Sequence, residues 1–461
     1  MVAEVLEAAG LSASEVAAWR SATPTTLGSF PAAARATCEF LTRGEELLRR
    51  LPPRPERSET EQAAADELNA FLNGARSDFM RGYAADVYRA LTDDMRLALR
   101  VDELTYAAAD LYPGLVPTRG AMEEERARRL ADKEGIEIAQ GLFLSFVLAS
   151  ERAGLHLVWS MLRPTEAALE RLDEFRVRGV AEVGHAYVER RGHAALVELR
   201  NPRHLNAEDG DTLGDTEVAV DLALLDPEVE VGVFRGGVLD HPKYTGGRIF
   251  GAGINLTHIY MGKLDYLFYI TRDMGYVNKL YRGLSRDEHR PGEPEDTIEK
   301  LWVAAVETYA IGGACQLLHT MDHVIATRGC RLYLPARKEG IIPGASNLRL
   351  ARSVGDRLAR QAIVSGLEFH AGTPQGDLLC DEVVDSAADM DAAIEARVEA
   401  LLSSGLVNAA ANRRAMRVGV EPPEVFREYM AMYCREQAYC HLSPALVRNL
   451  EENWNAHERK L

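Results

Sequence analysis

The chain has 461 residues, with 53 Lys and Arg against 70 Asp and Glu, so its formal net charge is −17 at pH 7. This acidic balance argues against nucleic-acid binding, which needs a basic surface to displace counterions. Hydrophobic residues make up 47% and charged residues 27%, which excludes a wholly disordered chain and supports two or three domains with large cores.

The sequence also lacks the features of exported and membrane-spanning chains. It contains no run of eighteen apolar residues, and its first residues form an acidic amphipathic pattern without a basic leader. The six cysteines are scattered without C-x-x-C spacing. We therefore expect a cytoplasmic protein whose cysteines are reduced core thiols.

The first region, residues 1–177, has the pattern of helices almost throughout. Apolar residues recur at spacings of three and four with charged residues between them, and prolines separate the periodic segments. This pattern predicts a helical N-terminal domain, for which packing or oligomerisation is the simplest role.

Alternating β-branched runs begin near residue 178, and a hairpin turn is expected at 191–193. A helix through VAVDLALL, a strand at VEVGVFRG, a strand at WVAAVE and a helix at LLHTMDHVIA follow, and the chain is again helical beyond about residue 350. The alternation predicts an α/β domain over 178–385. Helices over 386–461 are expected to complete this domain and to make oligomer contacts.

Two glycine clusters stand out in the α/β region, GGRIFGAGINL at 246–256 and YAIGGACQ at 309–316. Neither is a P-loop, because no Gly-Lys-Ser/Thr follows. Glycines let a backbone approach a ligand and present its N–H groups, and a helix beginning at the second cluster adds its positive end. Tight turns are the alternative for either cluster alone, whereas the pair favours an oxyanion hole.

Four motifs resemble those of the crotonase (enoyl-CoA hydratase/isomerase) superfamily. They are NPRHLNA at 201–207 (N-R/P-P-x-x-x-N-A), RIFGAGINL at 248–256 (K-A-F-x-A-G-A-D-L), AIGGACQ at 310–316 (A-x-G-G-G-x-E) and IPGA at 342–345 (I-P-G-x). The resemblance covers residues 178–385 and implies a stacked ββα spiral domain. It implies that the backbone N–H groups of Ile254 and Gly313 hold the thioester oxygen of an acyl-CoA.

The chain departs from the hydratases of this superfamily at two positions. Gln316 and Ala336 stand where the hydratases carry carboxylates, so ordinary hydration is not expected. One branch combines a long helical N-terminal domain with this Gln, and the chain is similar to it. That similarity implies a dioxygenase that converts (3,5-dihydroxyphenyl)acetyl-CoA and O2 to (3,5-dihydroxyphenyl)glyoxylate and CoA without metal or organic cofactor. Its product would supply dihydroxyphenylglycine for antibiotic biosynthesis.

The resemblance also implies roles for individual residues. Glu208, Arg272 and Gln316 are expected beside the dihydroxyphenyl ring, since a carboxylate accepts from a phenol hydroxyl and a guanidinium donates to one. Without the resemblance, Glu208 would be an acid at a helix N-terminus and Arg272 a solvated surface charge. Ile341 is expected to line an apolar O2 pocket, although an isoleucine there is more often simple core. The expected substrate-binding residues are Arg203, His241, Lys243, Arg248, Ala252, Gly253, Asn255 and Gly312.

Several alternatives stay open at this point. His319 and His323 have the i, i+4 spacing of a metal site, but no third ligand is apparent, and Asp322 between them is expected to be structural within that helix. The same oxyanion hole would serve a thioester hydrolase or an isomerase, and the loss of both acids also allows a non-catalytic scaffold. We expect a homotrimer or homohexamer that binds acyl-CoA and O2 but neither nucleic acid nor membranes.

Overall fold

The computed structural model describes residues 2–25, 28–286, 297–403 and 405–460. The chain divides into two compact units. Unit 1 comprises Met1–Val158, Tyr260–Leu267 and Pro423–Val447, and unit 2 comprises Trp159–Ile259, Phe268–Pro422 and Arg448–Leu461. The division into residues 1–177, 178–385 and 386–461 stays a prediction; in the structure, part of the C-terminal helical region is grouped with the N-terminal helices.

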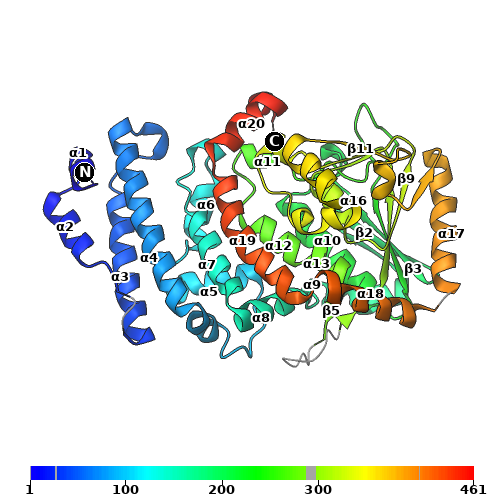
Figure 1. Cartoon of the computed structure of the whole chain (residues 1–461), viewed down its shortest axis with the longest axis horizontal. Coiled ribbons are helices and arrows are strands. Elements are labelled where there is room, and N and C mark those ends of the chain that lie inside the picture. The colour runs from blue at the N-terminus through cyan, green and yellow to red at the C-terminus, as the bar shows by residue number, and fades with distance from the viewer. Residues whose placement is uncertain (1, 26–27, 287–296, 404, 461) are drawn as a thin grey trace. The chain divides into compact units, whose positions relative to one another are not determined.

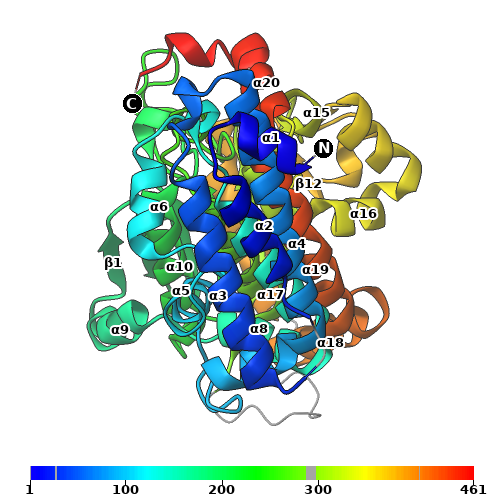
Figure 2. The ribbon, with the colours of Figure 1, turned by 90° about the vertical axis from the view of Figure 1, so that its left-hand side faces the viewer.

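Unit 1 is all-helical, as the sequence pattern predicted. Its helices are α1 (Val2–Ala8), α2 (Ala13–Ser21), α3 (Phe30–Leu48), α4 (Glu59–Leu91), α5 (Val101–Leu111), α6 (Arg119–Arg126), α7 (Glu137–Ala149) and α19 (Pro423–His441), while α8 (Glu151–Met161) and α20 (Pro444–Trp454) cross the boundary between units. Figures 1 and 2 show α3 and α4 side by side. Phe40 and Leu41 on α3 are buried in one core with Leu68 and Leu72 on α4, which shows how the spacing of three and four residues forms this layer.

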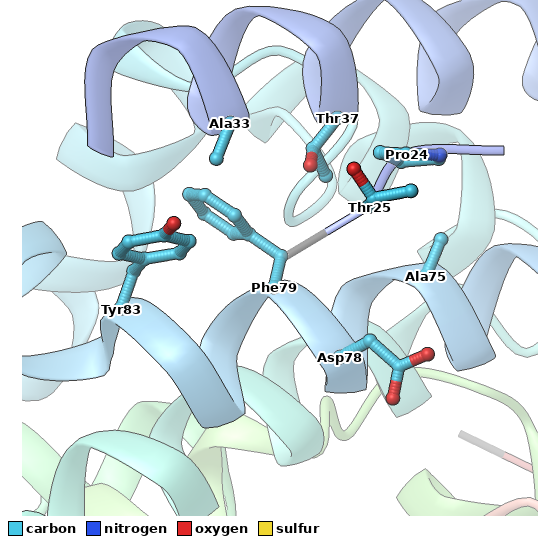
Figure 3. Close-up of a pocket in the computed structure, with 8 residues that line it drawn as sticks. All are labelled: Pro24, Thr25, Ala33, Thr37, Ala75, Asp78, Phe79 and Tyr83. Carbon is cyan, nitrogen blue, oxygen red and sulfur yellow. The ribbon is translucent and has the colours of Figure 1, made fainter. Parts of the chain in front are cut away.

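A small pocket lies in unit 1 beside α3 and α4 (Figure 3). Its lining residues are Pro24, Thr25, Ala33, Thr37, Ala75, Asp78, Phe79 and Tyr83. None of the residues predicted for the functional site lines this pocket, so it plays no part in the candidate site. Among the described residues, no single helix is long and apolar enough to cross a membrane, and one bent pair, Glu137–Ala149 with Glu151–Arg178, reaches that length only when both halves are counted.

Unit 2 is built on a seven-stranded sheet in the order β1-β2-β3-β4-β7-β9-β12. Its strands are β1 (Val180–Val183), β2 (Ala186–Arg191), β3 (Ala194–Leu199), β4 (Val231–Gly236), β7 (Leu301–Val306), β9 (His323–Thr327) and β12 (Glu382–Val384). Strands β1 to β3 form an antiparallel meander, and every later pairing is parallel. The predicted hairpin turn is confirmed, because Arg191 pairs with Ala194.

Helices cover both faces of this sheet (Figure 1). One face packs on α10 (Gly210–Leu225) and the other on α17 (Met390–Ser403). Alternate residues serve the two cores, since Phe234 is in the α10 core and Val233 in the α17 core. Strands buried on both faces are continuously apolar, as VGVF and WVAAV are.

The remaining elements of unit 2 surround these layers. The strands are β5 (Leu284–Ser285), β6 (Thr297–Ile298), β8 (Tyr309–Ile311), β10 (Arg331–Tyr333) and β11 (Phe369–His370). The helices are α9 (Glu166–Arg178), α11 (Leu256–Tyr260), α12 (Leu267–Met274), α13 (Tyr276–Arg282), α14 (Gly313–Leu318), α15 (Ala336–Glu339), α16 (Ser346–Arg360) and α18 (Leu406–Val420). The last residue of α11 and the first residue of α12 are assigned to unit 1. In a second sheet, in the order β11-β10-β8, strand β8 is the first part of the second glycine cluster and ends directly before Gly312.

One predicted element is wrong. The segment LLHTMDHVIA is not a single helix, because α14 ends at Leu318 and His323–Thr327 forms β9. Strand β9 is paired on both sides, by β7 and β12, and these long-range hydrogen bonds override the local helical pattern.

Candidate active site

The first glycine loop is paired with the segment that precedes α10. Glu208 N donates to Gly253 O at 2.7 Å, and Asn255 N donates to Glu208 O at 2.7 Å. In this parallel bridge the N–H of Ile254, the residue between them, points away from Glu208. Among the described residues, the Ile254 N–H donates no backbone hydrogen bond. This N–H is therefore free to bind a ligand.

The second glycine cluster lies against the first. Ile311 N donates to Gly251 O at 3.1 Å, and a Cβ on Gly253 would lie only 3.0 Å from Gly313 N. Gly253 has a φ of +81°, a conformation that favours glycine. Within the described part of the chain the Gly313 N–H, at the start of α14, has no acceptor either. Two unpaired N–H groups thus stand on adjoining backbone segments.

Arg272 on α12 lies beside Gly313 and is only 1% exposed. Its Nε and Nη2 bind the two Glu208 oxygens at 2.8 Å each, and Nη2 also donates to Gly313 O at 2.8 Å. Its Nη1 donates to Asp273 Oδ1 at 2.8 Å and to Gln316 Oε1 at 2.9 Å. All five donors of the guanidinium are therefore used within the protein.

The carboxylate of Glu208 is the main partner of this guanidinium. Its Oε1 also accepts from the Tyr276 hydroxyl on α13. Burial by itself lowers the pKa of Arg272, but Glu208, Tyr276 and Asp273 together raise it well above its usual value. Burial, with help from Glu208, also raises the pKa of Tyr276 well above its usual value, against the opposing effect of Arg272. Arg272 is thus permanently charged and Tyr276 is a permanent donor.

Gln316 is fixed by the same cluster. Because its Oε1 accepts from Arg272, its Nε2 is turned to the other side, where no acceptor among the described residues binds it. The loop after α15 closes on this amide, since a Cβ on Gly344 would collide with Gln316 Oε1 and with Asp273 Oδ2. Ile341, three residues earlier in that loop, is 7% exposed. Glu208, Arg272, Gln316 and Gly313 are therefore brought together, with the Ile341 loop beside them.

The basic residues expected along the path of CoA lie outside this cluster. Arg203 and Lys243 are exposed, and Lys243 Nζ lies 5.0 Å from the centre of the Tyr244 ring. His241 Nδ1 accepts from the backbone N–H of Lys243 at 3.3 Å. Within the described residues, none of these three side chains is hydrogen-bonded to Glu208, Arg272 or Gln316.

Arg248 and the remaining loop residues have structural contacts. Arg248 Nη1 donates to Glu198 Oε1 at 2.6 Å and to a backbone carbonyl at 2.9 Å, so its guanidinium is held by the protein. Ala252 N donates to Leu205 O at 3.2 Å, and Gly312 N donates to Tyr333 O at 2.8 Å. These bonds fix the backbone two residues before the Ile254 N–H and one residue before the Gly313 N–H.

Sequence reasoning missed three residues of the site: Asp273 and Tyr276 in the Arg272 cluster, and Asp209 beside the first glycine loop. Asp209 had a signal, because D-x-x-T before an apolar run is typical of a helix cap, and Asp209 indeed begins α10 with its side chain accepting from Thr212 N. The acid at the helix N-terminus is therefore Asp209, and not Glu208 as the alternative interpretation expected. Asp273 and Tyr276 had no signal beyond their closeness to Arg272 in the chain.

The pair His319 and His323 does not share a helix, since His323 lies in β9. Burial lowers the pKa of His319 to about 3. Asp322 is structural, but outside any helix: its Oδ2 accepts from Trp302 N at 2.8 Å and its Oδ1 pairs with Arg413 Nε at 2.8 Å. In the part of the chain that the structure describes, no group of three His, Cys, Asp or Glu side chains is placed to hold a metal ion.

Comparison with known proteins agrees with this geometry. The family model of enoyl-CoA hydratase/isomerase matches residues 189–432, more than half of the chain. The chain belongs to this family. Within this crotonase family, it is 45% identical over 405 residues to (3,5-dihydroxyphenyl)acetyl-CoA 1,2-dioxygenase of Amycolatopsis orientalis, covering 88% of this chain and 92% of that protein.

Other crotonase-family relatives match a smaller part. The short-chain-enoyl-CoA hydratase of Clostridium acetobutylicum is 28% identical over 207 residues, 44% of this chain and 70% of that protein. The crystal structure of an enoyl-CoA hydratase from Mycobacterium avium subsp. paratuberculosis K-10 aligns with a TM-score of 0.48 and 18% identity over 61% of this chain and 99% of that one. The match to the dioxygenase is long enough that it necessarily includes more than half of residues 1–177.

Proposed function

We propose that this crotonase-family protein is a cofactor-independent dioxygenase that converts (3,5-dihydroxyphenyl)acetyl-CoA and O2 to (3,5-dihydroxyphenyl)glyoxylate and CoA. The identity to a dioxygenase of that substrate across both units supports the proposal. The observation that carries it is a pair of unpaired N–H groups, at Ile254 and Gly313, beside carboxylates that are already paired with Arg272. Such a site can stabilise an enolate but lacks the two free acids of a hydratase.

The oxyanion hole would make the first step accessible. The thioester oxygen accepts from the N–H groups of Ile254 and Gly313, and negative charge develops on it as the α-proton leaves. One donor of this kind is typically worth about 3–4 kcal/mol in the transition state. The α-carbon of an arylacetyl thioester is benzylic, so the ring also delocalises the carbanion.

The carbanion then reacts with O2 itself. It transfers electrons to O2 and forms a C–O bond, giving a peroxide at the α-carbon. The distal peroxide oxygen attacks the thioester carbonyl and expels CoA as the thiolate. Loss of the second α-hydrogen as a proton and cleavage of the O–O bond leave the α-keto acid, so both oxygen atoms of O2 enter the product. Ile341, buried in the loop next to Gln316, would line the apolar space for O2.

The ring hydroxyls need donors and acceptors that the protein has not already used. Gln316 Nε2 has no acceptor among the described residues, and Glu208 Oε2 accepts only from Arg272 in that part of the chain. We assign these two atoms to the ring hydroxyls. Arg272 has no spare N–H, so its role is to orient Glu208 and Gln316 and not to bond to the ring as first expected. Arg203 and Lys243, both exposed, are the candidates for the CoA phosphates.

The decisive experiment is incubation with (3,5-dihydroxyphenyl)acetyl-CoA under ¹⁸O2 after treatment with a metal chelator. We expect two ¹⁸O atoms in the product, and O2 consumption equal to CoA release. A thioester hydrolase would release CoA equally well without O2, and an isomerase would release none. Absence of turnover with any acyl-CoA would favour a scaffold.

We also propose that the protein is a homotrimer or homohexamer. Helix α18 exposes four large apolar side chains, which a contact with another copy of the chain would cover. They are Val407 (87% exposed), Met416 (65%), Val418 (76%) and Val420 (49%). Sedimentation equilibrium should give three or six chains per particle; a monomer at micromolar concentration would contradict the proposal.

A further inference from the structure

The first oxyanion loop is bound to a second carboxylate that takes no part in the Arg272 cluster. Asp209 is 2% exposed and caps α10, where its Oδ1 accepts from the N–H groups of Asp211 and Thr212 at 3.2 Å each. One oxygen is sufficient for this cap. Its other oxygen, Oδ2, faces the loop and accepts from Asn255 Nδ2 at 3.1 Å.

Further donors approach the same oxygen. Asn201 Nδ2 donates to Asp209 Oδ2 at 3.3 Å, and His258 Nδ1 lies 3.4 Å away. The Oδ2 atom therefore joins the segment before α10, the Ile254 loop and α11. The segment before α10 is distant in the chain from the Ile254 loop and from α11, which directly follows that loop, and all three meet at this carboxylate.

Asn255 directly follows Ile254, so its restraints pass to the Ile254 peptide. Its backbone N donates to Glu208 O at 2.7 Å, its side-chain Oδ1 accepts from His258 N at 3.2 Å, and its Nδ2 is held by Asp209. The side-chain amide of Asn255 thus has one partner at Oδ1 and one at Nδ2. Rotation of Asn255 would break at least one of these bonds and would turn the neighbouring peptide.

We propose that Asp209 is a positioning residue of the oxyanion hole, whose carboxylate holds Asn255 and thereby aims the N–H of Ile254 at the thioester oxygen. The inference rests on the proposed function. The adjacent residues Glu208 and Asp209 then support the two donors separately. Glu208, through Arg272, fixes Gly313, and Asp209, through Asn255, fixes Ile254.

The variant Asp209→Asn separates this role from the helix cap. Asn is as good a cap as Asp, so its Oδ1 can still accept from the N–H groups of α10. Its Nδ2 would face the Nδ2 groups of Asn255 and Asn201, placing donor against donor. We expect kcat to fall about 10- to 100-fold with KM changed less than threefold, because a displaced oxyanion donor acts mainly on the transition state. Asp211→Asn, the same change at an exposed side chain in the first turn of α10, should leave both constants unchanged.

A reciprocal exchange tests the specific bond. In Asp209→Asn combined with Asn255→Asp, the new carboxylate accepts from the new amide and still accepts from His258 N. We expect kcat to recover at least tenfold relative to Asp209→Asn. A purely structural cap predicts no recovery, which would overturn the proposal. If Asp209→Asn does not fold, Asn255→Ala removes the same bond from the other side, and unchanged kcat in that variant would overturn it equally.

A binding measurement that needs no catalytic turnover distinguishes this inference from the proposed function. Benzoyl-CoA has no α-proton, and difference infrared spectroscopy can follow its thioester C=O stretch when bound. We expect a shift to lower frequency in the wild type and a smaller shift in Asp209→Asn. No shift in the wild type would contradict the oxyanion hole itself, whereas equal shifts in both proteins would contradict the role of Asp209 alone.

Discussion

Each unit contains a charged cluster buried from solvent, and the two are built differently. In unit 2 the guanidinium of Arg272 donates five hydrogen bonds to Glu208, Asp273, Gln316 and Gly313. In unit 1, Lys133 Nζ and Glu137 Oε1 are 2.9 Å apart, and both side chains are fully buried.

The polar groups around the second cluster are less completely paired. Among the described residues, Glu137 Oε2 and both amide atoms of Gln140 have no hydrogen-bond partner. Burial raises the pKa of Glu137, and Lys133 opposes this shift. In the Arg272 cluster the buried Asp273 Oδ2 likewise has no partner among the described residues. Every N–H of the Arg272 guanidinium has an acceptor, however, so the orientation of this side chain is fixed. The guanidinium of Arg272 is planar, and all of its N–H groups are used, so any other orientation would lose hydrogen bonds. The Arg272 cluster can therefore hold a catalytic geometry.

The largest effect should come from Arg272→Lys. An ammonium keeps the positive charge but has three donors and cannot replace five, so buried acceptors of this cluster would be left without a hydrogen bond, which costs about 1–3 kcal/mol for each. We expect kcat to fall by roughly 1,000-fold or more, since Gly313 and Gln316 both lose their partner. Steady-state kinetics and urea unfolding measure the two effects. The matched change Arg178→Lys, at a pair on the surface of α9, should alter stability by less than about 0.5 kcal/mol. Retention of a tenth of the wild-type kcat in Arg272→Lys would show that this cluster does not orient the site.

Gly313→Ala should have the next largest effect. The new Cβ would lie 2.7 Å from Glu208 Oε2 and 3.2 Å from Arg272 Nη2, so either the cluster or the second oxyanion donor must move. A kcat decrease of about 100-fold is expected. Gly210→Ala, at a glycine whose added Cβ meets nothing within 4 Å, is the control. Equal activity of the two variants would mean that the contact between Gly313 and the cluster is unimportant.

Glu339 differs from the carboxylates of both buried clusters. Among the described residues, no charged partner is bound to its carboxylate. Burial raises its pKa from 4.5 to about 7. Below pH 4.5 the carboxyl is protonated in both the folded and the unfolded states, so no penalty arises. Between these two values the folded state binds the extra proton and stability falls with rising pH, by at most about 3 kcal/mol. Glu339→Gln should therefore be more stable than the wild type at pH 8 and equal to it near pH 4.5, measured by urea unfolding. Glu399→Gln on the surface of α17 should show no such pH dependence, and a pH-independent difference for Glu339→Gln would refute the assignment.

The smallest expected effect is that of Gln140→Leu. Its amide is fully buried near the Tyr106 hydroxyl, and neither amide atom makes a hydrogen bond of normal geometry among the described residues. Replacing an unpaired buried amide by an apolar side chain of similar size should raise the free energy of unfolding by about 1 kcal/mol. Gln62→Leu on the surface of α4 should change it by less than half as much. A loss of stability in Gln140→Leu would indicate that ordered water binds this amide.

Sequence reasoning identified the backbone of the site better than its side-chain contacts. The two glycine clusters were recognised as a pair, and the structure places Gly253 against Gly313. The assumption that Arg272 bonds to the substrate was reasonable for a guanidinium in isolation. The five acceptors that occupy it come from α12, α14 and the loop before α10, which no local pattern brings together.

The sequence by itself largely determined the secondary structure. The 3.6-residue period specified the helices of unit 1, and the apolar runs specified the buried strands. Glycines marked the place where two backbone segments come into contact. Tertiary structure decided which of two local alternatives prevailed. His323 follows His319 at helical spacing, yet it lies in β9, because pairing with β7 and β12 satisfies more backbone groups than another helical turn would. Tertiary structure likewise decided the partners of the buried charges, since Glu208, Asp209 and Arg272 are oriented by acceptors and donors that are distant in the chain and close only in the fold.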